Sequence, residues 1–156
     1  MQRVTEARVR VDGEVVGEIG AGLCVLVGVG KYDWIPQASK LAVKVAHSRI
    51  FDDEIGVMNY SLLQTGGGAL VVSQFTLYGD ASHGRRPNWG AAASRKHAST
   101  LINVFEGSLT GLGVPVQSGR FGADMQVALV NDGPVTVLIE VPEGTDTPAH
   151  VLRYYH

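Results

Sequence analysis

The sequence has very little of what redox, secreted and membrane proteins need. Its 156 residues include one cysteine, Cys24, so an internal disulfide cannot form. Cys24 lies in the apolar run 23–27, where a thiol is most simply a small buried hydrophobic side chain. No apolar run approaches the roughly 18 residues of a membrane span, and the start Met1-Gln2-Arg3 is not followed by a signal-peptide core. These absences favour a cytoplasmic protein without redox chemistry.

The motifs of common cofactor, metal and hydrolase sites are also missing. Gly28-Val29-Gly30-Lys31 resembles part of a phosphate loop, but an earlier glycine is lacking and Tyr32 stands where Ser or Thr would bind magnesium. The histidines have no metal-ligand spacing, and no Gly-x-Ser-x-Gly motif occurs. We therefore expect neither a metal nor a serine hydrolase triad.

Negative charge is absent from one stretch of the chain. The net charge of -2 argues against a protein that coats nucleic acid indiscriminately. Residues 81–105 nevertheless lack Asp and Glu while carrying Arg85, Arg86, Arg95 and Lys96. Such a window could hold a small anionic ligand or one end of an RNA through phosphate contacts. A solvated loop and helix face is the alternative, since runs of charge usually face water.

Apolar patterns predict an α+β protein with a mainly antiparallel, barrel-like sheet and two helices. The 45% hydrophobic content is enough for the core of one domain, residues 1–142, followed by a polar C-terminal tail, residues 143–156. Turns are expected at Asp12-Gly13 and at Asn131-Asp132-Gly133-Pro134, each joining two strands. The predicted strands are 4–11, 15–19, 23–29, 49–51, 69–72, 114–119, 126–130 and 135–141, and the predicted helices are 36–48 and 91–111.

The functional prediction centres on the stretch from Ala69 to Asp80. The apolar run 69–72 comes after three glycines and suits a strand buried on both faces. It then changes abruptly to Ser73-Gln74-Phe75-Thr76. A buried strand rigidly holds the residues at its end, and an exposed loop beyond it can offer main-chain amides and polar side chains to a ligand. On this stretch alone, a strand that simply runs out into solvent is the simpler interpretation.

Two motifs together resemble one family. Ser73-Gln74-Phe75-Thr76-Leu77 and Asn131-Asp132-Gly133-Pro134-Val135-Thr136 are similar to the paired Ser-Gln-x-Thr and Gly-Pro-x-Thr motifs of D-aminoacyl-tRNA deacylases. The resemblance ends near Val141. Two departures are the Asn88-Trp89 pair, where the family usually has Ser-Phe, and Tyr78-Gly79-Asp80, where small residues are usual. Further matching segments are Gln2-Arg3-Val4, 11–20, Arg49-Ile50-Phe51, Met58-Asn59, Gly84-Arg85-Arg86-Pro87 and 119–127.

The resemblance implies a homodimer with the D-aminoacyl-tRNA deacylase fold that hydrolyses the ester of D-aminoacyl-tRNA without a metal or organic cofactor. The Gly133-Pro134 bond, which can be cis at modest cost, would enter the active site of the partner subunit and leave no room for an L side chain. Glycyl-tRNA would be a side substrate. Arg85, Arg86 and Met125 are expected to bind the 3′-terminal aminoacyl-adenosine. The alternative is a non-catalytic protein that binds this tRNA end.

Ser73, Gln74, Phe75 and Thr76 are the predicted catalytic residues. Ester hydrolysis passes through an oxyanion, so the main-chain N–H groups near Phe75 and Thr76 are candidate donors to it. Ser73 and Gln74 would position the ligand through hydrogen bonds. The Thr76 hydroxyl is an alternative nucleophile, but no histidine lies near it in sequence to activate it. The rival is the ribose 2′-hydroxyl of the substrate, assisting a water molecule.

Overall fold

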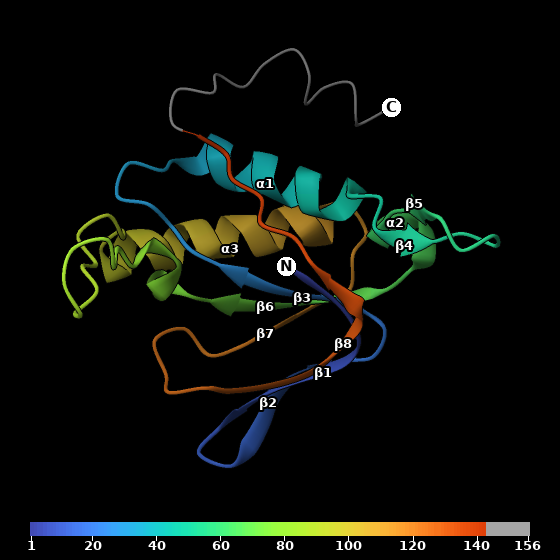
Figure 1. Ribbon diagram of the computed structural model, residues 1–156, viewed down its shortest axis with the longest axis horizontal. Helices are drawn as coiled ribbons and strands as arrows, with labels where there is room; N and C mark the ends of the chain where they lie inside the picture. Colours follow the sequence, from blue (N-terminus) through green and yellow to red (C-terminus); the bar gives the residue numbers. More distant parts are fainter. Residues whose placement is uncertain (143–156) are drawn as a thin grey trace.

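The computed structural model describes residues 1–142, and the predicted tail 143–156 lies outside the described residues. Figure 1 shows helices α1 and α3 stacked on one face of a strongly curved sheet. In chain order the elements are β1 (Gln2–Val11), β2 (Glu14–Ile19), β3 (Gly22–Val27), α1 (Ile35–His47), β4 (Phe51–Asp52), β5 (Met58–Tyr60), α2 (Leu62–Thr65), β6 (Gly68–Ser73), the 3-10 helix η1 (Phe75–Tyr78), α3 (Arg95–Gly111), β7 (Val116–Ser118) and β8 (Gln126–Thr136). No helix within the described range is long and apolar enough to cross a membrane.

The main sheet is mixed and nearly closed. Its order is β2-β1-β3-β6-β7, and β8 pairs with β1 beside this path. β1 is antiparallel to β2, β3 and β8, whereas β3 and β7 are both parallel to β6. The two ends of the order approach each other, because a Cβ on Gly17 in β2 would lie 2.5 Å from the Ser118 carbonyl oxygen in β7. The predicted α+β, barrel-like fold is confirmed, with parallel pairing at its centre.

Hydrophobic cores cover both faces of the central strands. Val25 and Val71 pack with Phe105 of α3 on the helical side. Leu70 and Cys24 point to the other side, inside the barrel. Because alternate residues of a strand face opposite sides, two buried faces require the unbroken apolar runs seen in the sequence. The Cys24 side chain is buried as predicted, and burial raises the pKa of its thiol.

Several predicted boundaries shift when side-chain and tertiary contacts are included. α3 begins at Arg95 and not at residue 91, because the Ser94 hydroxyl accepts the His97 N–H at 3.4 Å and caps the helix there. Residues 91 and 93 instead hydrogen-bond to the chain just after β3. Elements α2 and η1 were not predicted, since one turn is too short to show a helical period. Strands predicted at 23–29, 49–51 and 114–119 form at 22–27, 51–52 and 116–118.

The predicted turn at residues 131–134 is wrong. One strand, β8, runs through Gln126–Thr136, and the separate strand predicted at 135–141 does not form. Its pairing with β1 passes from Val4 opposite Asn131 to Gln2 opposite Thr136. The four residues 132–135 on β8 therefore stand opposite the single residue Arg3 on β1, and they bulge out of the ladder. We call residues 132–135 the Gly-Pro bulge.

Candidate active site

The predicted catalytic motif lies where β6 ends and η1 begins. Ser73 is paired with Val27 at the end of the neighbouring strand β3, and the Gln74 N–H donates to the Val27 carbonyl at 2.8 Å. A pocket of about 440 Å³ opens here, and its lining includes Ser73, Gln74, Phe75 and Met125. We call it the β6 pocket. The structure thus brings together three of the four predicted catalytic residues and one predicted substrate-binding residue.

Two main-chain donors at the start of η1 have no acceptor in the described part of the chain. The N–H groups of Phe75 and Thr76 precede the first hydrogen bonds of this short helix, which begin with the Leu77 N–H and the Gln74 carbonyl at 3.3 Å. Strand β6 comes directly before these two residues, and it holds them in place because its residues 69–72 are buried. The arrangement provides rigid N–H donors next to a ligand-sized pocket.

Thr76 has no activating base. Its hydroxyl oxygen accepts a hydrogen bond from the Gln74 side-chain amide, and Thr76 does not line the β6 pocket. Within residues 1–142 no histidine or carboxylate is hydrogen-bonded to it. The ring of His97 contacts Asp33 and not Thr76, since its Nε2 lies 2.7 Å from the Asp33 carbonyl oxygen. These contacts leave a threonine hydroxyl that is weak as a nucleophile.

An aromatic contact joins η1 to residues 80–90, which contain Arg85 and Arg86 and which we call the basic loop. The Phe75 ring meets the Trp89 ring edge to face, with centroids 5.4 Å apart and planes at 68°. Gly79 leaves room for this indole, since a Cβ there would lie 2.5 Å from Trp89 Cζ3. Trp89, at the position where the resemblance leads us to expect phenylalanine, therefore fixes the position of the chain just after η1.

No residue of the basic loop itself lines the β6 pocket. The loop is closed at its base by two main-chain hydrogen bonds between Asp80 and Asn88, of 2.9 and 2.8 Å. Hydrogen bonds from the Ser82 hydroxyl and then from its N–H lower the pKa of the Asp80 carboxyl. Arg85 and Arg86 lie on the exposed part of the loop, and neither lines the pocket.

The Gly-Pro bulge presents an exposed cis peptide bond between Gly133 and Pro134. The Asn131 side chain closes the base of the bulge. Its Oδ1 accepts the Val135 N–H at 2.7 Å, and its Nδ2 donates to the Thr136 hydroxyl at 3.0 Å. The bulge is therefore a fixed feature of β8, with its tip directed into solvent.

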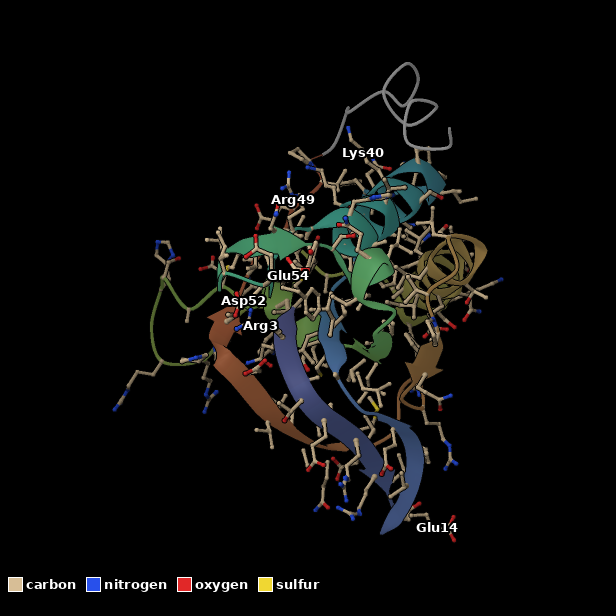
Figure 2. All side chains as sticks on the ribbon, turned by 90° about the vertical axis from the view of Figure 1, so that its right-hand side faces the viewer. Arg3, Glu14, Lys40, Arg49, Asp52 and Glu54 are labelled. Atoms are coloured by element: carbon tan, nitrogen blue, oxygen red, sulfur yellow. The ribbon has the colours of Figure 1, made fainter. Side chains whose placement is uncertain are left out.

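Arg3 supports the bulge from beneath, a role that sequence reasoning missed. The residue is only 7% exposed, and its Nε donates to the Asp132 carbonyl at 3.0 Å. Its Nη1 donates to the Ile50 carbonyl at 2.9 Å and lies 3.1 Å from Asp52 Oδ1. Figure 2 shows Arg3 and Asp52 next to each other. Asp52 thus forms an ion pair with a buried cation. The sequence offered one signal of this role, because an arginine at an inward-facing position of a strand needs buried partners.

Within one chain the bulge and the pocket do not meet. The β8 side of the pocket is formed by Met125 and Val127, at the start of the strand, whereas the bulge lies near its end. Neither Gly133 nor Pro134 lines the pocket. A larger cavity of about 690 Å³, between the end of β3, α1 and residues 138–142, contains none of the predicted site residues. We therefore take the smaller pocket, which Ser73, Gln74, Phe75 and Met125 line, as the candidate site.

Within residues 1–142 no group of three His, Cys, Asp or Glu side chains is placed to hold a metal ion.

The model of the D-Tyr-tRNA(Tyr) deacylase family matches residues 1–140. The chain belongs to this family. Deacylases of this kind are ester hydrolases, so the sequence-based expectation of an enzyme is confirmed at the level of the family.

Individual relatives agree with this family membership. The chain is 56% identical to a D-aminoacyl-tRNA deacylase of Thermomicrobium roseum over 143 residues, 92% of this chain and 93% of the relative. It is 54% identical to a D-aminoacyl-tRNA deacylase of Thermus aquaticus over 143 residues, 92% of this chain and 94% of that one.

Two solved structures share the fold. The c-Myc DNA unwinding element binding protein superposes with a TM-score of 0.84 at 36% identity, covering 90% of this chain and 96% of its own. A probable eukaryotic D-amino acid tRNA deacylase superposes with a TM-score of 0.75 at 18% identity, covering 85% and 92%. The deacylase-like fold predicted from the sequence is confirmed.

Proposed function

We propose that this protein hydrolyses the ester of D-aminoacyl-tRNA to free D-amino acid and tRNA, a chiral proofreading reaction of the cytoplasm. The observation that carries the proposal is the β6 pocket of a chain in the deacylase family. There the main-chain N–H groups of Phe75 and Thr76, which have no acceptor within residues 1–142, follow directly after a buried strand and lie beside a pocket lined by Ser73 and Gln74.

The N–H groups of Phe75 and Thr76 suit the charge that ester hydrolysis develops. Attack of water on the ester carbonyl moves an electron pair onto the carbonyl oxygen, and collapse of this oxyanion expels the ribose oxygen. Donors already fixed before the reaction stabilise that oxyanion without reorganising, a large contribution to catalysis. Ser73 and Gln74 would position the ester, and the ribose 2′-hydroxyl would assist the water molecule. No side chain of the site then needs to become a covalent nucleophile.

The Gly-Pro bulge would provide stereoselectivity by entering the pocket of a second subunit. It is exposed, braced by Arg3 and Asn131, and unable to serve the pocket of its own chain. In a homodimer its main-chain carbonyl oxygens would accept hydrogen bonds from the substrate α-amino group. The bulge would then leave no space for an L side chain. Such a filter reads handedness without reading the side chain, so glycyl-tRNA would also be hydrolysed.

The deciding experiment compares D-tyrosyl-tRNA with L-tyrosyl-tRNA as substrates of the purified protein. We expect rapid release of D-tyrosine and little release of L-tyrosine. The alternative is a protein that binds the aminoacylated tRNA end without catalysis. Binding of both substrates with hydrolysis of neither, even at enzyme concentrations near that of the substrate, would establish this alternative.

Replacing Thr76 by Ala should leave the deacylase active within about tenfold of the wild type, because no base activates its hydroxyl. Loss of a true nucleophile lowers kcat by on the order of 10⁴-fold or more. The measurement is single-turnover hydrolysis of D-tyrosyl-tRNA. As a comparison, a substrate whose terminal ribose lacks the 2′-hydroxyl should react far more slowly. A Thr76→Ala protein that binds substrate but has lost the chemical step would make Thr76 the nucleophile.

Replacing Arg85 and Arg86 together by Ala should weaken tRNA binding and reduce its salt dependence. Each phosphate contact to a single strand contributes about 0.7 to the slope of log K against log salt, so two lost contacts remove about 1.4. Affinity is measured from roughly 50 to 200 mM salt, with Lys40→Ala plus Lys44→Ala on α1 as the charge-matched control. An unchanged slope would show that both arginines are solvated surface residues.

A further inference from the structure

One lining residue of the β6 pocket is unlike the others in charge. Arg95 is the only charged side chain among the described residues that line it. The remaining lining residues are apolar, or uncharged and polar like Ser73 and Gln74. Arg95 is the first residue of α3 and is exposed, and its guanidinium lies against Gly122, another lining residue. A ligand in the pocket would therefore lie within reach of a positive charge.

The guanidinium group of Arg95 is held against the pocket wall. Its Nη2 donates to the Gly122 carbonyl oxygen at 3.2 Å. Gly122 has φ +74°, and a Cβ at this residue would overlap the guanidinium, so the group lies directly against the glycine main chain. A guanidinium has five N–H donors. The other N–H donors of Arg95 make no hydrogen bond within residues 1–142, and Arg95 forms no ion pair with a carboxylate of these residues.

A positioned cation with unused donors favours an anionic group in the ligand. In the proposed substrate, the terminal ribose bears the aminoacyl ester on one side and a phosphate on its 5′ oxygen. The planar N–H fork of arginine matches two phosphate oxygens. The substrate α-amino group is positively charged and would be repelled, so the aminoacyl end should point away from Arg95.

We propose that Arg95 binds the phosphate on the 5′ side of the 3′-terminal nucleotide and thereby sets the direction in which the ester enters the β6 pocket. This inference rests on the proposed function and specifies which part of the substrate the pocket recognises. Arg95 differs from Arg85 and Arg86, which lie outside the pocket lining and would contact phosphates farther along the tRNA.

The test uses two small esters that differ only in the phosphate. One is adenosine carrying D-tyrosine on its 2′(3′)-oxygen, and the other is the same ester with a 5′-phosphate. For the wild type we expect kcat/KM to be about tenfold or more higher with the phosphate, the effect of a charge-assisted hydrogen-bonded pair. In Arg95→Gln the ratio should fall to about one. Arg95→Lys should keep part of it, and Lys96→Gln, which removes a neighbouring charge outside the pocket lining, should keep all of it.

Failure of this inference is distinguishable from failure of the proposed function. A wild type that hydrolyses neither ester, and no D-aminoacyl-tRNA, refutes the function itself. A wild type that hydrolyses both esters equally overturns the role of Arg95. So does an Arg95→Gln protein that keeps the wild-type ratio, or one that loses activity on both esters to the same extent. Melting temperature and mass in solution identify a misfolded Arg95→Gln protein, and the wild-type ratio together with Arg95→Lys then decides the question.

Discussion

Replacing Gly133 by Ala should lower turnover of D-tyrosyl-tRNA by about 100-fold or more while leaving the protein folded. Gly133 has φ +135°, which L side chains rarely adopt, and a Cβ there would lie 2.7 Å from Val135 Cγ2 and 3.0 Å from the Val135 nitrogen. The bulge must therefore shift to accept a methyl group. A displacement of about 1 Å in a positioning element costs about 100-fold in rate. Strain in a loop of this kind costs on the order of 1–3 kcal/mol of stability.

The rate ratio between D-tyrosyl-tRNA and L-tyrosyl-tRNA is the measurement that matters for Gly133→Ala. Gly20→Ala is the matched control, because a Cβ at Gly20 meets nothing within 4 Å and its φ is not in the positive range. If the bulge were only a structural part of β8, Gly133→Ala would lower the melting temperature but keep the D-to-L ratio. A normal rate and ratio in a stable Gly133→Ala protein would remove the bulge from the active site.

Mixed dimers test the proposal that the protein is a homodimer in which the bulge of one subunit serves the pocket of the other. Gly133→Ala damages the bulge, and Ala123→Trp would fill the β6 pocket, which Ala123 lines. Alone, Gly133→Ala should keep about one hundredth of the wild-type rate or less, and Ala123→Trp should be inactive. After unfolding and refolding together in equal amounts, half of the dimers are mixed, and each contains one intact pocket facing one intact bulge. About a quarter of the wild-type sites should then be active, an arithmetic consequence of random pairing. A mixture as inactive as its components would place the bulge and the pocket in the same chain.

The elements that sequence reasoning located correctly are those whose burial is local in pattern. Residues 69–72 had to be apolar on both faces because one core lies under α1 and α3 and another lies inside the barrel. Asp12 and Gly13, with φ of +51° and +83°, form the tight turn between β1 and β2 that their residue types favour. In both places the physical cause of the structure lies within a few residues.

Sequence reasoning failed where pairing between distant segments decides. The residues 131–134 favour a turn and a bulge equally well, since both use glycine and proline for local reasons. Pairing of β8 with β1 on both sides of the bulge selects the second outcome, and this pairing is not visible in a local pattern. The same limit applies to the candidate site. Residues 81–105, the stretch without Asp and Glu, contain Arg85, Arg86 and Arg95. Of these three arginines only Arg95 lines the pocket.

Replacing Arg3 by Met should destabilise the protein and, separately, slow deacylation. Arg3 donates to the carbonyls of Ile50 and Asp132 and pairs with Asp52, so one side chain joins β1, β8 and the start of β4. Hydrogen bonds from a charged donor contribute about 1.5–3 kcal/mol each. The Asp52 carboxylate is half exposed and regains water, and methionine fills much of the vacated volume. We therefore expect a net loss of about 2–3 kcal/mol in the free energy of unfolding.

Arg8→Met is the matched control on the same strand. Arg8 forms ion pairs only with Glu6 and Glu18, at 3.5 and 3.6 Å, and its side chain is 32% exposed. Surface pairs of this kind contribute about 0–1 kcal/mol, so its unfolding curve should be close to that of the wild type. Urea unfolding measures both variants. Turnover of D-tyrosyl-tRNA is then measured at a temperature where both are fully folded. There Arg3→Met should still be slower by about tenfold or more, because the bulge has lost its support. Equal rates would mean that Asn131 and the β1 pairing position the bulge without Arg3.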